Sequence, residues 1–196
     1  MTGKTWAGTT LRDRRAIRRA QLIEAGLDLL GTSGGAAVTV RAVCRRAKLT
    51  ERYFYESFAD REQLVLAVYE EVAAQAHRAL VDAVGGSGRD PAGRAEAAVS
   101  AFVEMMLDDP RKGRVLLLAP ITEPALSARG VALLPAFAGL VREQLPERMD
   151  ALEKQLTAIG LVGALTHLFT AYLSGTPAMS RDRLVAHCVR LLARSS

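Results

Sequence analysis

Cysteine is scarce in this chain: only Cys44 and Cys188 occur among 196 residues, far apart in the sequence. Two distant cysteines on helix-like apolar patterns do not suggest a disulfide framework, which is typical of small secreted proteins. The first 19 residues also carry bases without the apolar stretch of a signal peptide. We therefore expect both cysteines to be small buried side chains and the protein to be cytoplasmic.

Catalytic motifs are lacking as well. The sequence has no Gly-rich phosphate loop, no G-x-S-x-G elbow, no H-E-x-x-H pair and no paired-cysteine motif. Its three histidines and scattered carboxylates show no metal-ligand spacing. We expect no catalytic residue, no metal and no cofactor, and a small helical enzyme remains a distant alternative.

Aromatic residues make up only 5 % of the chain, whereas hydrophobic residues make up 49 %. Ala, Leu and Arg are abundant, and no strand-like alternation lasts beyond a few residues. This composition favours helices, so we predict an all-α protein. At 196 residues the chain is long enough for a domain of about 60–70 residues and one larger domain.

Residues 38–58 carry the most informative pattern, which predicts two short helices joined by a tight turn. Thr39 stands at the N-cap of the first helix. The apolar face of that helix is formed by residues at helical spacing: Val40, Val43, Cys44 and Ala47. A packed helix of this kind can present a second one to the major groove of DNA.

The second short helix has Thr50 as its expected cap and Phe54 and Phe58 on its inner side. The outward or rim positions are polar and rich in hydrogen-bonding groups: Thr50, Glu51, Arg52, Tyr53 and Tyr55. The alternative interpretation is two ordinary core helices with a solvated face.

The charge distribution favours DNA binding over that alternative. Eleven basic and six acidic residues lie in residues 1–60, so this third carries the whole net charge of +5. A local basic field attracts the phosphate backbone and supplies the sequence-independent part of DNA affinity.

From about Arg19 to Tyr69 the chain resembles the N-terminal domain of the tetracycline-repressor (TetR) family of bacterial transcription regulators. The matching segments are Leu22–Leu30, Gly34, Thr39–Val40, Leu49–Thr50 and Phe54–Leu64. Tyr55 three residues before Phe58, followed by the Ala59–Leu64 run, is the most specific part. Lys48 stands where the family usually has Gly, Cys44 where it often has Ala, and Arg61 where its basic residue is usually Lys.

This resemblance implies a partition of DNA contacts. Tyr55, Arg61 and the helix start at Thr39 would hold phosphates, while residues 50–53 would face base edges. The complete set of candidate DNA-binding residues is Thr39, Arg41, Thr50, Glu51, Arg52, Tyr53, Tyr55, Arg61, Arg12, Arg14 and Arg15.

Residues 1–18 are predicted to form a basic N-terminal arm, followed by the helix-turn-helix domain at 19–60. The arm could lie against phosphates or insert arginines into a narrow minor groove. Alternatively, it is a solubilising extension of the first helix.

Residues 61–196 are predicted to form an all-α ligand-binding and dimerisation domain. Asp60 should cap a helix to about residue 84, and Asp90 and Pro91 should begin one that ends near residue 108. Further helices are expected at about 110–118, 124–145, 148–174 and 180–194. We expect a connector between Pro120 and Pro124 and an interruption of the 124–145 helix near 130–135.

No charged side chain occurs between Lys154 and Arg181. The continuous apolar segment, 158–173, is shorter than the ~20 residues that span a membrane, so we expect no membrane partner. A helix that is apolar all round must be buried, which favours a homodimer through a four-helix bundle. The expected interface residues are Gly160, Gly163, Ala164, Leu165, Leu168, Leu184, Cys188 and Leu191.

The resemblance also implies a small effector held within the second domain, and an apolar wall would favour a hydrophobic or aromatic molecule. Candidate lining residues are Phe102, Met105, Met106, Leu117, Thr122, Glu123, Phe137, Thr166, His167, Phe169 and Tyr172, although core packing is the more common role for side chains of this kind. We thus expect a cytoplasmic, nucleoid-associated repressor that leaves a palindromic operator when its effector binds. The alternative is a ligand-independent DNA-binding regulator controlled by a protein partner or by its abundance.

Overall fold

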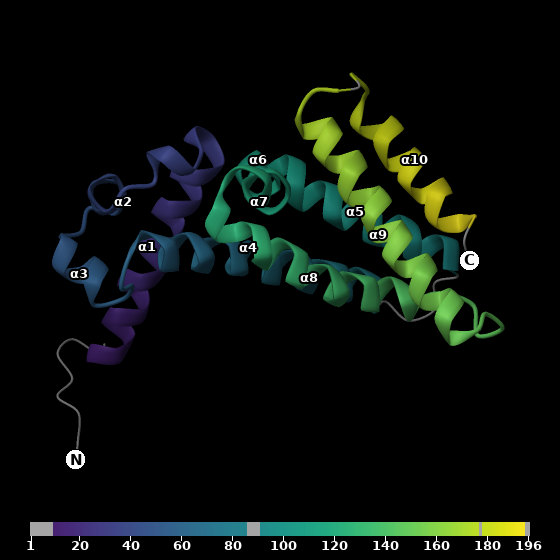
Figure 1. Ribbon diagram of the computed structural model, residues 1–196, viewed down its shortest axis with the longest axis horizontal. Helices are drawn as coiled ribbons and strands as arrows, with labels where there is room; N and C mark the ends of the chain where they lie inside the picture. The colour runs from purple at the N-terminus through teal and green to yellow at the C-terminus, as the bar shows by residue number, and fades with distance from the viewer. Residues whose placement is uncertain (1–9, 86–90, 177, 195–196) are drawn as a thin grey trace, which may run out of the picture.

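The computed structural model describes residues 10–85, 91–176 and 178–194, which form helices and no strands. The predicted all-α class is confirmed. The N-terminal part, residues 10–60, is called the head here and lies at the left of Figure 1. It contains α1 (Leu11–Ser33), the short helix η1 (Gly35–Ala37), α2 (Val40–Ala47) and α3 (Glu51–Tyr55).

The core of the head explains why three short elements hold together. Leu22 of α1, Val43 of α2 and Phe54 of α3 have no exposed surface. Phe58 packs beside Phe54, with ring centroids 5.7 Å apart. The side chains that the sequence assigned to the inner side are therefore the ones that join the helices.

α1 begins earlier than expected. The Thr10 hydroxyl accepts a hydrogen bond from the Asp13 backbone N–H at 3.1 Å, and the Asp13 carboxylate accepts one from the Thr10 N–H at 2.9 Å. This reciprocal capping starts the helix at Leu11. Residues 11–18, predicted as part of the arm, are thus the first turns of α1, and residues 1–9 lie outside the described residues.

α4 (Arg61–Val84) connects the head with the second domain. Asp60 caps it as predicted, because its carboxylate accepts the Gln63 N–H at 2.8 Å. Leu64, Val68 and Val72 are almost fully buried along one side of the helix. The same helix therefore belongs to one hydrophobic core that extends from the head into the second domain.

The second domain continues with α5 (Pro91–Asp108), α6 (Pro110–Gly113), a π-helical segment η2 (Arg114–Leu118) and α7 (Ala119–Thr122). It ends with α8 (Pro124–Arg142), α9 (Ala151–Leu173) and α10 (Arg181–Ala193). The start of α5 at Pro91 is confirmed, whereas its expected cap, Asp90, lies outside the described residues.

Two expectations for this domain are wrong. Residues 119–122 are helical rather than a connector, because Pro120 occupies the first turn of α7, where a missing N–H costs little. α8 is not interrupted near 130–135 either, and Pro135 lies inside it. Packing against both α4 and α9 holds α8 together although proline removes one helical hydrogen bond.

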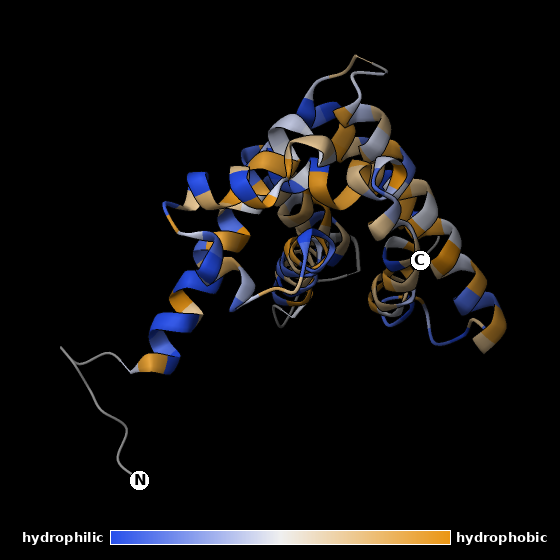
Figure 2. Cartoon of the chain, turned by 60° about the vertical axis from the view of Figure 1, so that its left-hand side comes forward, coloured by the Kyte–Doolittle hydropathy of each residue, from blue (hydrophilic) through white to orange (hydrophobic). Residues whose placement is uncertain are grey.

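The long helices run side by side, α4 against α5 and α8, and α8 against α9, while α10 packs on α5. α4 and α8 run away from the head, and α5 and α9 run back towards it (Figure 1). Figure 2 shows hydrophilic residues dominating the first turns of α1, whereas hydrophilic and hydrophobic residues alternate along the helices of the second domain. Two helices, α8 and α9, are long and apolar enough to cross a membrane, and only 11 % and 22 % of their most apolar stretches are buried within the chain.

Candidate nucleic-acid interface and cavity

The turn between α2 and α3 is built as the two-helix pattern requires. Thr39 caps α2 by accepting the Ala42 N–H at 3.2 Å. Lys48 ends the helix in the left-handed conformation, with φ 55° and ψ 38°, and the Leu49 N–H reaches back to the Cys44 carbonyl at 2.9 Å. Thr50 occupies the N-cap position of α3, but its side chain makes no capping hydrogen bond.

α3 presents a polar face to solvent. Thr50, Glu51, Arg52 and Tyr55 are exposed, and Tyr53 is half-buried. The guanidinium of Arg18 on α1 lies 4.2 Å from the centre of the Tyr53 ring, a cation–π contact. Residues 50–53, which were expected to face bases, therefore lie on one surface. α1 contacts the edge of that surface through Arg18.

Glu56, just after α3, contacts residues of both α1 and α3. Its carboxylate lies 3.3 Å from Nε of Arg52 and 3.5 Å from Nη2 of Arg18. Its backbone carbonyl accepts a hydrogen bond from the Arg15 guanidinium. Arg41, also exposed, lies 3.5 Å from the Glu51 carboxylate. These pairs are solvent-accessible, so they orient the side chains with little effect on stability.

The basic residues of α1 lie beside the same surface. Arg12 and Arg15 are exposed and Arg14 is half-buried. Arg19 lies with its guanidinium 5.1 Å from the centre of the Phe58 ring. Because these arginines are part of a capped helix, they extend the positive surface of the head as a rigid element.

Arg61, which was expected to hold a phosphate, makes its contacts within the protein. Its guanidinium pairs with the Glu123 carboxylate at 2.7 and 3.2 Å. It also donates to the carbonyls of Val38 at 2.8 Å and Gly35 at 2.7 Å. The hydrogen bonds to Glu123 raise the pKa of Arg61. Arg61 thus joins the second domain to the backbone segment that leads into α2.

Glu123 consequently belongs to the joint between head and second domain rather than to a ligand site. It is only 9 % exposed, between α7 and α8. It packs so closely on Gly35 that a Cβ there would overlap its carboxylate oxygen. Glycine at 35 is therefore required by this close approach.

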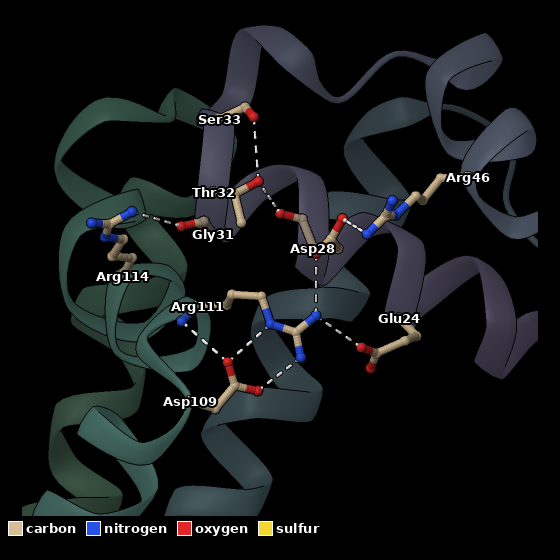
Figure 3. A network of polar contacts seen from close by, with 9 residues as sticks. All are labelled: Glu24, Asp28, Gly31, Thr32, Ser33, Arg46, Asp109, Arg111 and Arg114. Atoms are coloured by element: carbon tan, nitrogen blue, oxygen red, sulfur yellow. Dashed lines mark hydrogen bonds and ion pairs between the residues drawn. The ribbon is translucent and has the colours of Figure 1, made fainter.

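A second joint lies between α6 and α1 (Figure 3). Arg111 binds Asp109 through two parallel hydrogen bonds of 2.9 Å and reaches Glu24 at 3.0 Å and Asp28 at 3.4 Å. Asp28 also pairs with Arg46 of α2 at 2.7 Å. The hydrogen bonds from Arg111 lower the pKa of Asp109. The charges therefore connect α6 to both α1 and α2.

A cavity of about 580 Å³ lies in the second domain, lined by residues of α4, α5, α7, α8, α9, α10 and η2. Six of the predicted lining residues do line it: Phe102, Leu117, Phe137, Thr166, His167 and Phe169. Phe102 and Phe169 meet edge to face, with centroids 4.8 Å apart. The wall is almost entirely apolar. The sequence did not indicate the contributions of Tyr69 and Arg94.

The other five predicted lining residues are not part of the cavity wall. Met106 is fully buried in the core, and Met105 and Tyr172 pack against that core. Thr122 lies at the end of α7, next to Glu123. Helical periodicity shows that such positions face inwards, but it does not distinguish a packed core from a cavity wall.

The expected dimer residues divide into three groups. Leu184 and Cys188 are buried within the chain itself, where α10 packs on α5. Leu165, Leu168 and Leu191 are partly buried against the chain's own cores. Gly160 and Gly163 are exposed and Ala164 is half-buried.

The sequence analysis missed the most exposed apolar residues of α9. Leu152, Leu156 and Ile159 are 64 %, 61 % and 54 % exposed. They precede Gly160 and Gly163 at helical spacing, and a Cβ at either glycine would meet nothing within 4 Å. Together they form an apolar outer face, Leu152–Gly163, that no described part of this chain covers.

Both cysteines are buried and unpaired, as predicted. Burial raises the pKa of the Cys188 thiol to about 11 and also raises that of Cys44. Within the described ranges, no group of three or more His, Cys, Asp or Glu side chains is arranged to hold a metal ion.

Comparison with known proteins agrees with this geometry. Residues 22–68 match the family model described as bacterial regulatory proteins, tetR family. No curated protein sequence matches the chain.

The chain is similar in fold to solved transcription regulators. The fatty acid degradation regulator FadR from Bacillus halodurans is 15 % identical, with a TM-score of 0.75 over 89 % of this chain and 94 % of that one. A TetR-like regulator from Rhodococcus sp. RHA1 is 19 % identical, with a TM-score of 0.66 over 91 % and 95 %. The multidrug binding protein EbrR, solved with imidazole, is 20 % identical, with a TM-score of 0.65 over 89 % and 94 %. Residues 22–68 thus match the tetR family of bacterial regulatory proteins, and the whole chain has the fold of TetR-like transcription regulators.

Proposed function

We propose that the protein is a sequence-specific DNA-binding transcription regulator that reads base edges with α3. One observation carries this proposal: the polar face of α3 is exposed, while Phe54 within the helix and Phe58 just after it anchor the segment in the core. A short helix held this way can enter the major groove. The positive charge of the head lies beside it and supplies attraction to phosphates.

We assign direct base contacts to residues 50–53, with Arg52 the strongest candidate because a guanidinium can bind guanine through two hydrogen bonds. Thr39, Arg41 and Tyr55 are assigned to phosphates. Arg12, Arg14 and Arg15 would reach the backbone from α1 as a helical extension. Arg61 is left out of this set because Glu123 and two carbonyls occupy its guanidinium.

The regulator is proposed to act as a homodimer. The apolar outer face of α9, Leu152–Gly163, is the surface that a second copy would cover, and its small residues would allow close helix contact. A two-fold axis there would present two copies of α3 to a palindromic operator. α9 would then need no membrane to cover its apolar residues, in keeping with a cytoplasmic protein.

The cavity supports the further proposal of a repressor that leaves DNA when a small hydrophobic effector binds. Pro120 and Ile121 line the cavity and lie just before Glu123, which holds Arg61 and through it the start of α2. The names of two similar structures, a regulator of fatty acid degradation and a multidrug binding protein, fit such effectors. The alternative is a ligand-independent regulator, in which filling the cavity would leave DNA affinity unchanged.

The DNA-binding proposal is tested by selecting sites from random duplexes with the wild-type protein and measuring affinities by fluorescence anisotropy. Arg52→Ala should weaken the selected site by about 1–3 kcal/mol and flatten the preference at one base position per half-site. Arg45→Ala is a control, because this exposed residue lies on α2 outside the proposed contact set. If Arg52→Ala lowers the affinity for selected and random DNA equally, Arg52 contacts a phosphate and the assignment to a base is wrong.

A further inference from the structure

Glu56 lies between the first helix of the head and the arginine proposed to read bases. It follows α3 directly and is half-buried. One carboxylate oxygen, Oε2, lies 3.5 Å from Nη2 of Arg18 on α1, and the other, Oε1, lies 3.3 Å from Nε of Arg52 on α3. A single carboxylate therefore bridges α1 and the exposed face of α3.

The α1 side of this bridge is the fixed side. The side chain of Arg18 is only 23 % exposed, and its guanidinium lies 4.2 Å from the centre of the Tyr53 ring. Arg15, one turn earlier on α1, donates a hydrogen bond to the backbone carbonyl of Glu56. The side chain of Arg52, by contrast, is 85 % exposed. Glu56 is thus held from α1 by its backbone and its side chain, and it limits the freedom of Arg52.

The way in which Arg52 is held determines which of its N–H groups remain for DNA. A guanidinium has five N–H donors in a fixed fork, one on Nε and four on the two terminal nitrogens. The Nε donor points to the Glu56 carboxylate. The terminal nitrogens Nη1 and Nη2 are left, and two of their N–H groups run parallel. This pair matches the O6 and N7 acceptors that guanine presents in the major groove.

The bridge affects base recognition and general DNA affinity in opposite ways. In water, an exposed ion pair one helical turn long contributes little to stability. When α3 enters the groove, water is displaced and the attraction between Glu56 and Arg52 becomes stronger. A side chain that is already held also loses less freedom on binding. The negative charge of Glu56 nevertheless repels phosphates, so the bridge favours one base while reducing attraction to any DNA.

We propose that Glu56 is a positioning residue for base recognition, which holds Arg52 by Nε so that Nη1 and Nη2 meet a guanine in each operator half-site. This inference rests on the proposed reading of bases by α3. It adds the base that Arg52 reads and the residue that orients the guanidinium towards it.

The test uses the full-length protein and the site selected from random duplexes. Every base position of the half-site is replaced in turn, and affinities are measured by fluorescence anisotropy. Guanine should occupy the position at which Arg52→Ala flattens the preference. Glu56→Ala should lower the preference for guanine there by roughly 2- to 10-fold, the equivalent of the freedom of one side chain. Preferences at the other positions should persist, and the affinity for random DNA should stay equal or rise because a negative charge is lost.

Two further variants separate positioning from charge and from folding. Glu62→Gln is the matched control for charge, because Glu62 is an exposed acidic residue in the first turn of α4; it should retain every base preference. Glu56→Gln keeps the length of the side chain but has no charge and a single accepting oxygen. It should lose guanine preference in the same direction, and it repeats the test if urea denaturation shows that Glu56→Ala is not folded.

The contrary results are distinguishable. A base other than guanine at the Arg52 position, or a guanine preference that survives in both Glu56 variants, would overturn this inference and leave base reading by α3 intact. Equal flattening at every position would also overturn it, because a displaced α3 rather than a released Arg52 would be the cause. If the wild-type protein selects no sequence, the proposed function fails together with this inference.

Discussion

Lys48 is the one non-glycine residue with a positive φ among the described residues. A side chain in this left-handed conformation costs about 1–2 kcal/mol through contact of its Cβ with the backbone. Lys48 keeps this conformation because the buried residues of α2 and α3 hold the two helices in place on either side of it. This cost in conformational free energy therefore falls on the residue that sets the angle between the two helices.

Replacing Lys48 with glycine should therefore raise the free energy of unfolding. Relief of the left-handed strain is partly offset by the greater freedom of glycine in the unfolded chain, so we expect a net gain of up to about 1 kcal/mol. Urea denaturation measures it. Lys48→Ala is the control for loss of the charge, and a gain of the same size in that variant would show that strain at the Cβ is not the cause.

At the scale of elements, the joint between α4, α7 and the start of α2 is the contact best placed to couple the two domains. It consists of Arg61, Glu123 and the carbonyls of Gly35 and Val38. Glu123 is nearly buried, and removing one partner of such a pair leaves the other charge without compensation. The joint is thus a structural link, and it lies next to Pro120 and Ile121 of the cavity wall.

Glu123→Gln should lower the free energy of unfolding by about 1–2 kcal/mol. The loss is smaller than for a fully buried pair because the Arg61 side chain is 32 % exposed and solvent screens its charge. DNA affinity should fall severalfold, since the segment before α2 loses its anchor. The matched control is Glu70→Gln, which breaks an exposed pair with Arg129 that also joins α4 to α8. If both variants lose stability and DNA affinity equally, the joint has no special role.

Local patterns in the sequence were enough to predict several elements. Thr39, Asp60 and the Phe54–Phe58 pair act within a few residues of the backbone they organise, so spacing alone revealed them. The role of Arg61 could not be predicted, because its partner Glu123 lies in a distant part of the sequence. Likewise, the apolar stripe of α10 identified Leu184 and Cys188 as buried, but it did not indicate that α5 covers them.

At the scale of the whole molecule, the proposed dimer would explain why α9 has an apolar face at the surface of a single chain. Ile159→Arg would place a charge at the centre of that face in a dimer, where burying it unpaired costs several kcal/mol. The variant should sediment as a folded monomer, because Ile159 is exposed within one chain. Val81→Arg, at a half-exposed position on α4, serves as the control and should remain a dimer. An undisturbed dimer in the Ile159→Arg variant would place the interface elsewhere.

The central claim, that two copies of α3 read DNA about a two-fold axis, is tested most directly by a hydroxyl-radical footprint on the selected site. We predict two protected regions related by two-fold symmetry, with half-sites centred about 10–10.5 base pairs apart or a multiple of that spacing. Arg52→Ala should weaken both regions together. A single protected region, or uniform protection without symmetry, would contradict the account.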